Sequence, residues 1–441
     1  MQRRQFLQMA GMSAAGMSCS RAWSVSLATD APQRPAFPAS DHRWRPAWDA
    51  ALTILAGNIT TLPRYEQPVL IEGAVYAGVW QECGPYEGLV YAGLEWGSAP
   101  SAGTALPRHL QTAIANHMIF FALQRADGQL PASVKRSEVG FGQIQMVVPI
   151  AATAWELAQR TRNEELLTTA YGACSRWDAW LRRYRDTRKT GLVEGFCTYD
   201  TGQDNSPRWA GLPNRCPDAD ARKCPPIASL PRLCPDLSAT VYGGRIALAA
   251  MARALGKPAE AARWDEDAET LRSLILARLY SPEDAAFYDL DAQDRFCKVR
   301  STAITRVLGE HVLKPEIASD RKIFDEVWRR QLHNPKAFWT PFPFPSVALN
   351  DPAFVRPIPR NSWGGASQAL TALRAPRWME HYGKHAELNH LMRQWVEAIA
   401  ASHGFRQQMD PLTGEFTMAD PSGYSPAALV YLDFVQRLAR A

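Results

Sequence analysis

The sequence predicts an all-α fold, an α/α toroid with long loops and short β-hairpins, from three observations. First, apolar residues recur at helical spacing through many segments of about 12–20 residues, for example 143–161. Second, these segments follow one another without alternating strands. The chain has neither a Gly-x-Gly-x-x-Gly turn nor a P-loop, which argues against dinucleotide- and nucleotide-binding enzymes. Third, no repeat of fixed period occurs, which disfavours an ordinary helical array.

Roughly ten to twelve helices are expected, and they fall into sequential pairs. The segments that predict them are 46–58, 107–125, 143–161, 164–186, 238–255, 258–279, 319–332, 365–374, 378–402 and 424–439. Helices in sequential pairs are what an α/α toroid requires.

Four connections are too long for a simple bundle, namely 62–106, 187–237, 281–318 and 333–364. They are rich in Gly, Pro, Asp, Asn and aromatic residues, which indicates a binding surface at one end of the helical scaffold. Within them, residues 286–291 alternate apolar and polar side chains and predict a short hairpin.

The first residues have the pattern of a twin-arginine export signal. Arg3 and Arg4 are followed by Phe6 and Leu7, then by a mildly apolar stretch and small residues up to Ala28. We therefore expect a signal over residues 1–28, the twin-arginine translocase as the partner during export, and a periplasmic or secreted protein. Residues 29–441 are expected to form a single domain that has no membrane association after cleavage.

The charge balance excludes one class of function. The chain has 49 basic and 44 acidic residues, and the signal holds three of the basic ones, so the remainder carries a net charge of about +2. Because neither a basic stripe nor a recognition motif is present, nucleic-acid binding has no support.

Seven of the eight cysteines lie beyond the expected signal. Cys216, Cys224 and Cys234 lie in one Pro-rich insertion, at spacings that do not fit a zinc site. In an oxidising compartment these three residues are expected to pair, which would leave at least one of the seven thiols free.

The segment Tyr199–Trp209 gathers acids, an amide, an arginine and a tryptophan within eleven residues. Hydrolysis of a glycosidic bond needs a carboxylic acid to protonate the leaving oxygen and a second carboxylate to attack or to activate water. A sugar also needs aromatic and polar contacts. Composition alone favours a simpler interpretation, a turn closed by an Arg–Asp pair.

Within this segment, Gly202-x-Asp204-Asn205-Ser206-Pro207-Arg208 resembles the general-acid motif of the family 63 glycosidases, which include mannosylglycerate hydrolases and processing α-glucosidases. Trehalases have a looser version. Other segments resemble the family in the same order along the chain, over roughly residues 66–440. They are Gly78–Glu82, Asp127–Pro131, Phe342–Ser346, Asp351–Phe354, Arg360–Trp363, Asp410–Glu415 and Tyr424–Leu429.

The resemblance implies an (α/α)6 six-hairpin glycosidase that hydrolyses small α-linked glucosides or mannosides with inversion and without a cofactor. Asp204 would be the general acid. The sugar contacts that it implies are Trp80, Glu82, Asn205, Arg208, Trp209, Arg360 and Trp363. Each tryptophan taken alone is more often a core residue.

The sequence departs from the family at the second carboxylate. The family places its base, a glutamate, three or four residues before the Pro of an Asn/Asp-Pro-x-Thr-Gly motif, and here Gln408 and Gln407 occupy those positions. Glutamine cannot accept a proton from water. The base is then another residue, with Glu82, Glu87 and Glu415 as candidates, or the protein binds sugar with little turnover.

Other chemistries have weaker support. A polysaccharide lyase on the same scaffold would need a Tyr/His or Tyr/Arg pair. His381 and His385 are four residues apart, but Tyr382 stands where a zincin has glutamate, so we expect a solvated helix face and no metal.

Overall fold

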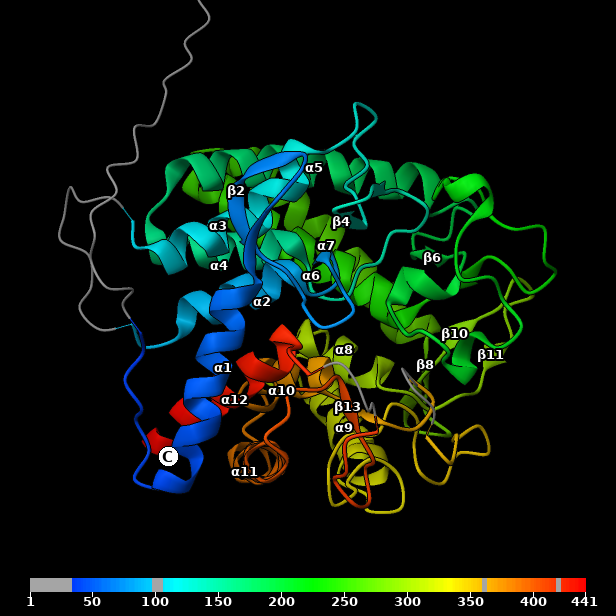
Figure 1. Cartoon of the computed structure of the whole chain (residues 1–441). Coiled ribbons are helices and arrows are strands. Elements are labelled where there is room, and N and C mark those ends of the chain that lie inside the picture. The colour runs from blue at the N-terminus through cyan, green and yellow to red at the C-terminus, as the bar shows by residue number, and fades with distance from the viewer. Residues whose placement is uncertain (1–33, 97–105, 359–362, 418–421) are drawn as a thin grey trace, which may run out of the picture.

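The computed structural model describes residues 34–96, 106–358, 363–417 and 422–441. The expected export signal over residues 1–28 lies outside this part of the chain. Helices dominate the described residues, and short strands connect them (Figure 1). None of the described helices is long and apolar enough to cross a lipid bilayer.

Six of the described helices, the inner helices, contact one another in a closed ring. They are α2 (Gly84–Gly93), α4 (Ile150–Thr161), α6 (Pro235–Ala254), α8 (Ala303–Gly309), α10 (Ala369–Met379) and α12 (Ser425–Arg440). Each packs on the next, and α12 packs on α2, which closes the ring. Every residue of α8 is buried, as expected for a helix with protein on all sides.

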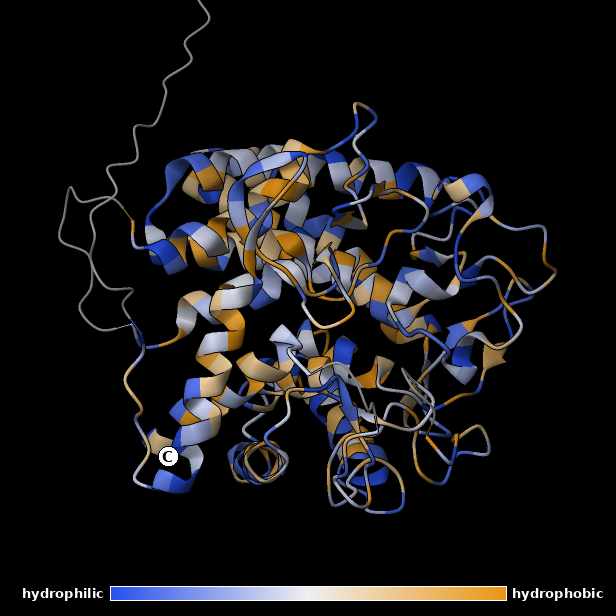
Figure 2. Ribbon diagram, viewed as in Figure 1, coloured by the Kyte–Doolittle hydropathy of each residue, from blue (hydrophilic) through white to orange (hydrophobic). Residues whose placement is uncertain are grey.

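The remaining α-helices lie outside this ring and bury one face. They are α1 (Arg45–Asn58), α3 (Arg108–Ala122), α5 (Glu164–Tyr184), α7 (Pro258–Arg278), α9 (Ala318–Val327) and α11 (His385–Ser402). Along α7 the buried apolar positions form one stripe that includes Ala261, Ala268 and Ile275. Hydrophobic and hydrophilic residues are accordingly interleaved along the peripheral helices (Figure 2).

The first and last helices meet. Helix α1 packs on α12, so segments from the two ends of the described chain lie side by side (Figure 1).

Short antiparallel strands join the helices at one end of the ring. The largest sheet has the order β11 (Phe296–Cys297), β10 (Asp289–Leu290), β7 (Arg232–Leu233) and β6 (Glu194–Gly195). A second sheet comprises β3 (Gly78–Trp80), β4 (Ser133–Lys135) and β5 (Val139–Gly140). The pairs are β1 (Ile59–Leu62) with β2 (Tyr65–Leu70), β8 (Tyr280–Ser281) with β9 (Ala286–Phe287), and β12 (Ser367–Gln368) with β13 (Gln408–Met409).

Short 3₁₀ turns complete the described secondary structure. They are η1 (His42–Trp44), η2 (Thr198–Thr201), η3 (Pro207–Trp209) and η4 (Pro217–Ala219), and a π-helical turn, η5 (Trp328–Leu332), continues α9.

Two predicted helices begin later than expected. In the segment 143–161 the helix α4 begins only at Ile150, because Gln145 has a positive φ of 47° and Pro149 is the N-cap. In the segment 378–402, α10 ends at Met379 and α11 begins at His385, since Gly383 has a φ of 66° that turns the chain.

Two helices were not predicted. Helices α2 and α8 lie inside the segments 62–106 and 281–318, which we expected to be loops. Both are short and buried on most of their surface, so neither has the apolar stripe that marks an amphipathic helix.

The predicted hairpin over residues 286–291 is divided between two sheets. Ala286 and Phe287 pair with Tyr280–Ser281, whereas Asp289 and Leu290 pair with β11 and β7. The alternation correctly indicated extended backbone but not the partners.

The cysteines of the Pro-rich insertion do not pair with one another. Cys216, Cys224 and Cys234 are all free thiols, and the Sγ of Cys216 lies 3.8 Å from the Sγ of Cys197 instead. Both of these thiols are buried beside the helical turn η2. The expected pairing within the insertion is therefore wrong for this structure.

All six inner helices point the same way. Their N-terminal ends lie beside the segment that carries Asp204: Thr302, the N-cap of α8, accepts a hydrogen bond from Gln203 at 3.1 Å, and the backbone N–H of Ser425 in α12 donates to Glu72 O at 2.8 Å. The C-terminal ends line a cavity of about 640 Å³ at the opposite end of the ring, near Glu310, Arg377 and Arg440.

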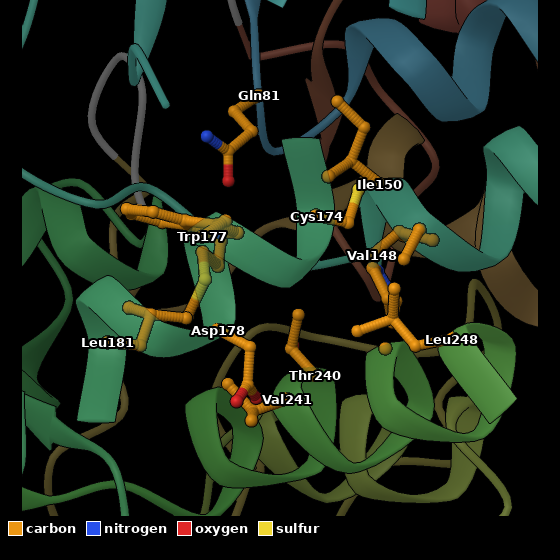
Figure 3. Close-up of a pocket in the computed structure, with 14 residues that line it drawn as sticks. Gln81, Val148, Ile150, Cys174, Trp177, Asp178, Leu181, Thr240, Val241 and Leu248 are labelled. Carbon is orange, nitrogen blue, oxygen red and sulfur yellow. The ribbon is translucent and has the colours of Figure 1, made fainter. Parts of the chain in front are cut away.

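A second, smaller cavity lies between helices α4, α5 and α6. It has about 40 Å³ of space and is lined mainly by apolar side chains, including Val148, Ile150 and Leu248, with Asp178 at one edge (Figure 3). This is room for a few water molecules and not for a sugar ring.

The buried ion pair between Arg185 and Asp200 gives a test of this fold. The Nη1–Oδ2 distance is 2.5 Å and both side chains are fully buried. Arg185→Met leaves a buried carboxylate without its cation, so we expect a loss of about 3–5 kcal/mol in the free energy of unfolding, measured by urea unfolding.

Arg222→Met is the matched control, because the Arg222–Asp220 pair is partly exposed. We expect that variant to lose less than about 1 kcal/mol. Equal losses in the two variants would contradict the structural role given to Arg185.

Candidate active site

The segment Tyr199–Trp209 is built on a buried aspartate, Asp200. Its Oδ1 accepts a hydrogen bond from the backbone N–H of Ile144 at 2.9 Å, and its Oδ2 accepts one from Phe196 at 2.7 Å. Together with the ion pair to Arg185, these bonds hold the N-terminal part of the segment in place.

Asp204 lies on a turn that follows this part of the segment. Gly202 and Asn205 both have left-handed backbone conformations, with φ of 61° and 59°. Asp204 is half-buried and Asn205 is exposed. The backbone N–H of Trp363 donates to the carbonyl of Asp204 at 3.3 Å, which ties the turn to the segment before α10.

Arg208 has a different role from the expected sugar contact. Its Nε and Nη2 donate to Asp289 at 2.7 and 2.5 Å, and its Nη1 and Nη2 donate to Asp236 at 2.8 and 2.7 Å. Nη1 also donates to Gln203 Oε1 at 3.0 Å. These bonds use all five N–H groups of a buried guanidinium, so Arg208 has no donor left for a ligand. It instead holds the segment Tyr199–Trp209, called the acid segment below, in position.

The three expected tryptophans are placed differently from one another. Trp209 is 2% exposed and donates its indole N–H to Thr201 Oγ1 at 3.0 Å, so it is a core residue. Trp363 is also 2% exposed and lies beneath the Arg306 guanidinium, 5.4 Å from its ring. The expectation that a sugar stacks on these two rings is therefore wrong, because neither ring is accessible. Trp80 is half-buried and keeps an accessible surface.

Glu82 lies directly against the acid segment. A Cβ built on Gly202 would come 1.7 Å from Glu82 Oε2, so only glycine allows this close approach. Gln145 Nε2 donates to the same oxygen at 3.1 Å, and Arg374 Nη2 donates to the Glu82 carbonyl at 3.1 Å. The Glu82 carboxylate thus lies against Gly202, two residues before Asp204 in the chain.

Gln407 and Gln408 face different surroundings. Tyr76 donates its hydroxyl to Gln407 Oε1 at 2.8 Å. Gln408 is paired in the β12–β13 ladder, where its side chain bonds Gln368 at 3.2 Å and Thr417 at 2.6 Å. Adjacent residues of a strand point to opposite faces. Gln407 therefore belongs to the site, and Gln408 belongs to the packing behind it.

A further carboxylate, Glu72, joins this group. It is 6% exposed and accepts a hydrogen bond from the Tyr424 hydroxyl at 2.7 Å. The Tyr424 ring lies 5.9 Å from Tyr76, whose other neighbour is Trp80 at 5.6 Å. Sequence reasoning missed Glu72; its only signal is an acid between an apolar strand end and Gly73.

Burial raises the pKa of Glu72, Glu82 and Glu87 above the ordinary value, most strongly for Glu72. The pKa of Glu72 is raised further by the negative charges of Glu87, Glu82 and Asp204. Arg374 and Arg306 oppose this effect at Glu82. For Tyr76, burial and then the charges of Glu72, Asp204 and Glu82 raise the pKa.

Of the other residues considered for the site, Arg360 lies outside the described residues. Glu415 is exposed on the turn after β13. Glu87 is fully buried in the first turn of α2, where its carboxyl neighbours the Cys83 thiol.

One group of possible metal ligands lies nearby. Cys197, Asp200 and Cys216 offer ligand atoms within 4.8 Å of one another. However, the Arg185 guanidinium already pairs with Asp200 and lies 3.6 Å from Cys216 Sγ. Its positive charge opposes a cation at this place.

The site therefore combines a half-buried acid on a rigid turn with two buried glutamates, a tyrosine and an accessible tryptophan. Paired carboxylates with separate surroundings suit proton donation at one atom and proton acceptance at another. Such pairs are the equipment of glycosidic bond hydrolysis.

Comparisons with known proteins agree with this chemistry. Residues 95–425 match the family model described as a mannosylglycerate hydrolase MGH1-like glycoside hydrolase domain. No curated protein is significantly similar to the chain.

Among solved structures, the chain is similar to the GH63 mannosylglycerate hydrolase from Thermus thermophilus. The TM-score is 0.68 at 18% identity, covering 88% of this chain and 99% of the other. Neutral trehalase Nth1 from Saccharomyces cerevisiae gives 0.61 at 14% identity, with 85% and 75% covered. A rhamnosidase from Klebsiella oxytoca gives 0.57 at 12% identity, with 91% and 65% covered. These likenesses show the fold.

The buried Glu87 carboxyl predicts a pH-dependent stability. Burial raises its pKa to about 7 from an ordinary 4.5. Its contribution to stability is thus fully present below about pH 4.5 and is lost as the pH rises through 7. Since Glu87→Gln stays neutral, we expect its stability relative to the wild type to rise over this range, by on the order of 2–3 kcal/mol.

Urea unfolding of both proteins at pH 5 and pH 8 measures this difference. The exposed Glu415 gives the control variant Glu415→Gln. A Glu87→Gln effect that is the same at both pH values would show that Glu87 ionises normally in the folded protein.

Proposed function

We propose that this chain, which belongs to the family of mannosylglycerate hydrolase MGH1-like glycoside hydrolases, cleaves small α-linked glycosides of the glucoside or mannoside type with inversion. Asp204 is the general acid. The observation that carries the proposal is the position of Asp204, half-buried on a turn whose Gly202 lies against the carboxylate of the buried Glu82.

In this reaction Asp204 gives its proton to the glycosidic oxygen as the bond to the anomeric carbon breaks, while water attacks that carbon from the opposite side and loses a proton to a carboxylate. The Asp200 anchor and the saturated Arg208 hold the acid in place without touching the sugar. The accessible Trp80 offers a ring on which a sugar stacks, and the exposed Asn205 offers an amide to its hydroxyls.

The proposal also includes the fold and the location of the protein. The closed ring of paired helices supports an (α/α)6 toroid within a single domain over residues 29–441. The sequence pattern of residues 1–28 supports export by the twin-arginine translocase to the periplasm or beyond.

One observation favours a second candidate, a carbohydrate-binding protein with weak turnover. Gln407 stands where the resemblance expects the catalytic base, and an amide accepts no proton from water. A binding protein of this kind would keep its affinity for sugar in an Asp204→Asn variant.

The test is hydrolysis of a panel of α- and β-linked disaccharides, aryl glycosides and mannosylglycerate by the purified chain, with the anomer of the product followed by NMR. We expect the β-anomer from α-linked substrates. Asp204→Asn should lower kcat/KM for disaccharides by about 10²–10⁴-fold, since the leaving oxygen loses its proton donor.

Asp218→Asn is the control, because it makes the same substitution at an exposed aspartate that pairs with Lys223. Sugar binding without turnover in the wild type would favour the binding protein. Turnover that is unchanged in Asp204→Asn would exclude Asp204 as the acid.

A further inference from the structure

The proposed reaction lacks an assigned base, and the geometry around Gln407 points to one. The Gln407 amide accepts the Tyr76 hydroxyl at 2.8 Å, and the Tyr76 ring packs on Tyr424 at 5.9 Å. Tyr424 in turn donates its hydroxyl to Glu72 at 2.7 Å. A carboxylate thus lies in the tyrosine cluster that holds the side chain of Gln407.

The backbone holds Glu72 firmly in this position. Its N–H donates to Gly78 O at 2.9 Å, and its carbonyl accepts the N–H of Ser425 at 2.8 Å. The following residue, Gly73, has a φ of 79°, and a Cβ there would come 2.5 Å from Gly423 O. The turn from Glu72 to Tyr76 is therefore pressed against the start of α12, the helix that follows the β12–β13 segment.

The other two glutamates, Glu82 and Glu87, are less suitable as the catalytic base. Glu82 lies against Gly202, within the turn that carries Asp204, and its carboxylate already accepts a hydrogen bond from Gln145. Glu87 is fully buried inside α2, without access to water. An inverting enzyme needs its base across the substrate from its acid. Glu72 contacts the segment at the start of α12, through the Tyr424 hydroxyl and the backbone N–H of Ser425.

We propose that Glu72 is the catalytic base of this chain and takes the place of the glutamate that Gln407 replaces. The inference rests on the proposed hydrolase function. As water forms its bond to the anomeric carbon, one water proton passes to the Glu72 carboxylate. The bond to the leaving oxygen breaks, and that oxygen takes the proton of Asp204. The Tyr76 hydroxyl hydrogen-bonds the attacking water.

Glycosyl fluorides separate the acid from the base. Fluoride leaves without protonation, so Asp204→Asn should hydrolyse an α-glycosyl fluoride at close to the wild-type rate, whereas Glu72→Gln should be slower by about 10²-fold or more on both the fluoride and the disaccharide. In Glu72→Ala, added azide should restore turnover of the fluoride and yield the glycosyl azide of inverted configuration. A merely structural residue would give no such product.

Glu310→Gln is the matched control. Glu310 is equally buried, at 6% exposure, but lies at the opposite end of the ring in the wall of the large cavity. We expect it to keep wild-type activity. Adding Gln407→Glu to Glu72→Gln should restore part of the lost rate, because a carboxylate then stands at the other side of Tyr76.

The outcomes distinguish this inference from the function itself. A wild-type chain that hydrolyses neither glycosides nor fluorides overturns both. Wild-type activity that persists in Glu72→Gln, or a folded Glu72→Ala that azide does not rescue, overturns only the assignment of Glu72. If Glu72→Gln does not fold, Glu72→Asp replaces it. Because the aspartate side chain is one methylene shorter, its carboxylate lies farther from the substrate, so kcat should fall with little change in KM.

Discussion

The ion pairs of Arg208 are the constraint on which the site depends. One guanidinium joins Asp236, at the start of α6, to Asp289, in the four-stranded sheet, and all three side chains are buried. Because Arg208 also belongs to the acid segment, this network fixes the segment relative to both a helix of the inner ring and a sheet outside it. Removal of Arg208 would leave the buried Asp289 carboxylate without its cation, so we expect it to be strongly destabilising.

Two more arginines, Arg306 and Arg374, lie near the buried carboxylates of the site and oppose their negative charge. Arg306 pairs with Asp236 and donates to the carbonyl of Thr201, and burial lowers its pKa to about 10. Arg374 binds the carbonyl of Glu82. Cations, together with the N-terminal ends of the inner helices, thus surround a region where several carboxylates are buried. Without them, that number of acids could not share so small a volume.

Much of this arrangement could be predicted from the sequence. The long amphipathic helices were found because each has an apolar stripe, and the turn that carries Asp204 was singled out because its residues resemble a family motif. Helices α2 and α8 were missed because they are buried all round and have no stripe. Arg208 and Trp209 were expected to contact sugar, since composition shows neither burial nor saturation. Glu72 was missed because its partners, Tyr424 and Tyr76, are set by tertiary packing.

The packing of α12, the last helix, against the early part of the chain has a consequence for how the protein folds during synthesis. Glu72 and Tyr424 are separated by 352 residues, and the helix that follows Tyr424 also closes the ring against α2. No nascent fragment that lacks the last helix can contain the assembled site. Contacts between such distant residues form slowly, because a long loop of chain must be ordered first. Appearance of activity would therefore report completion of the whole ring and not the folding of any part of it.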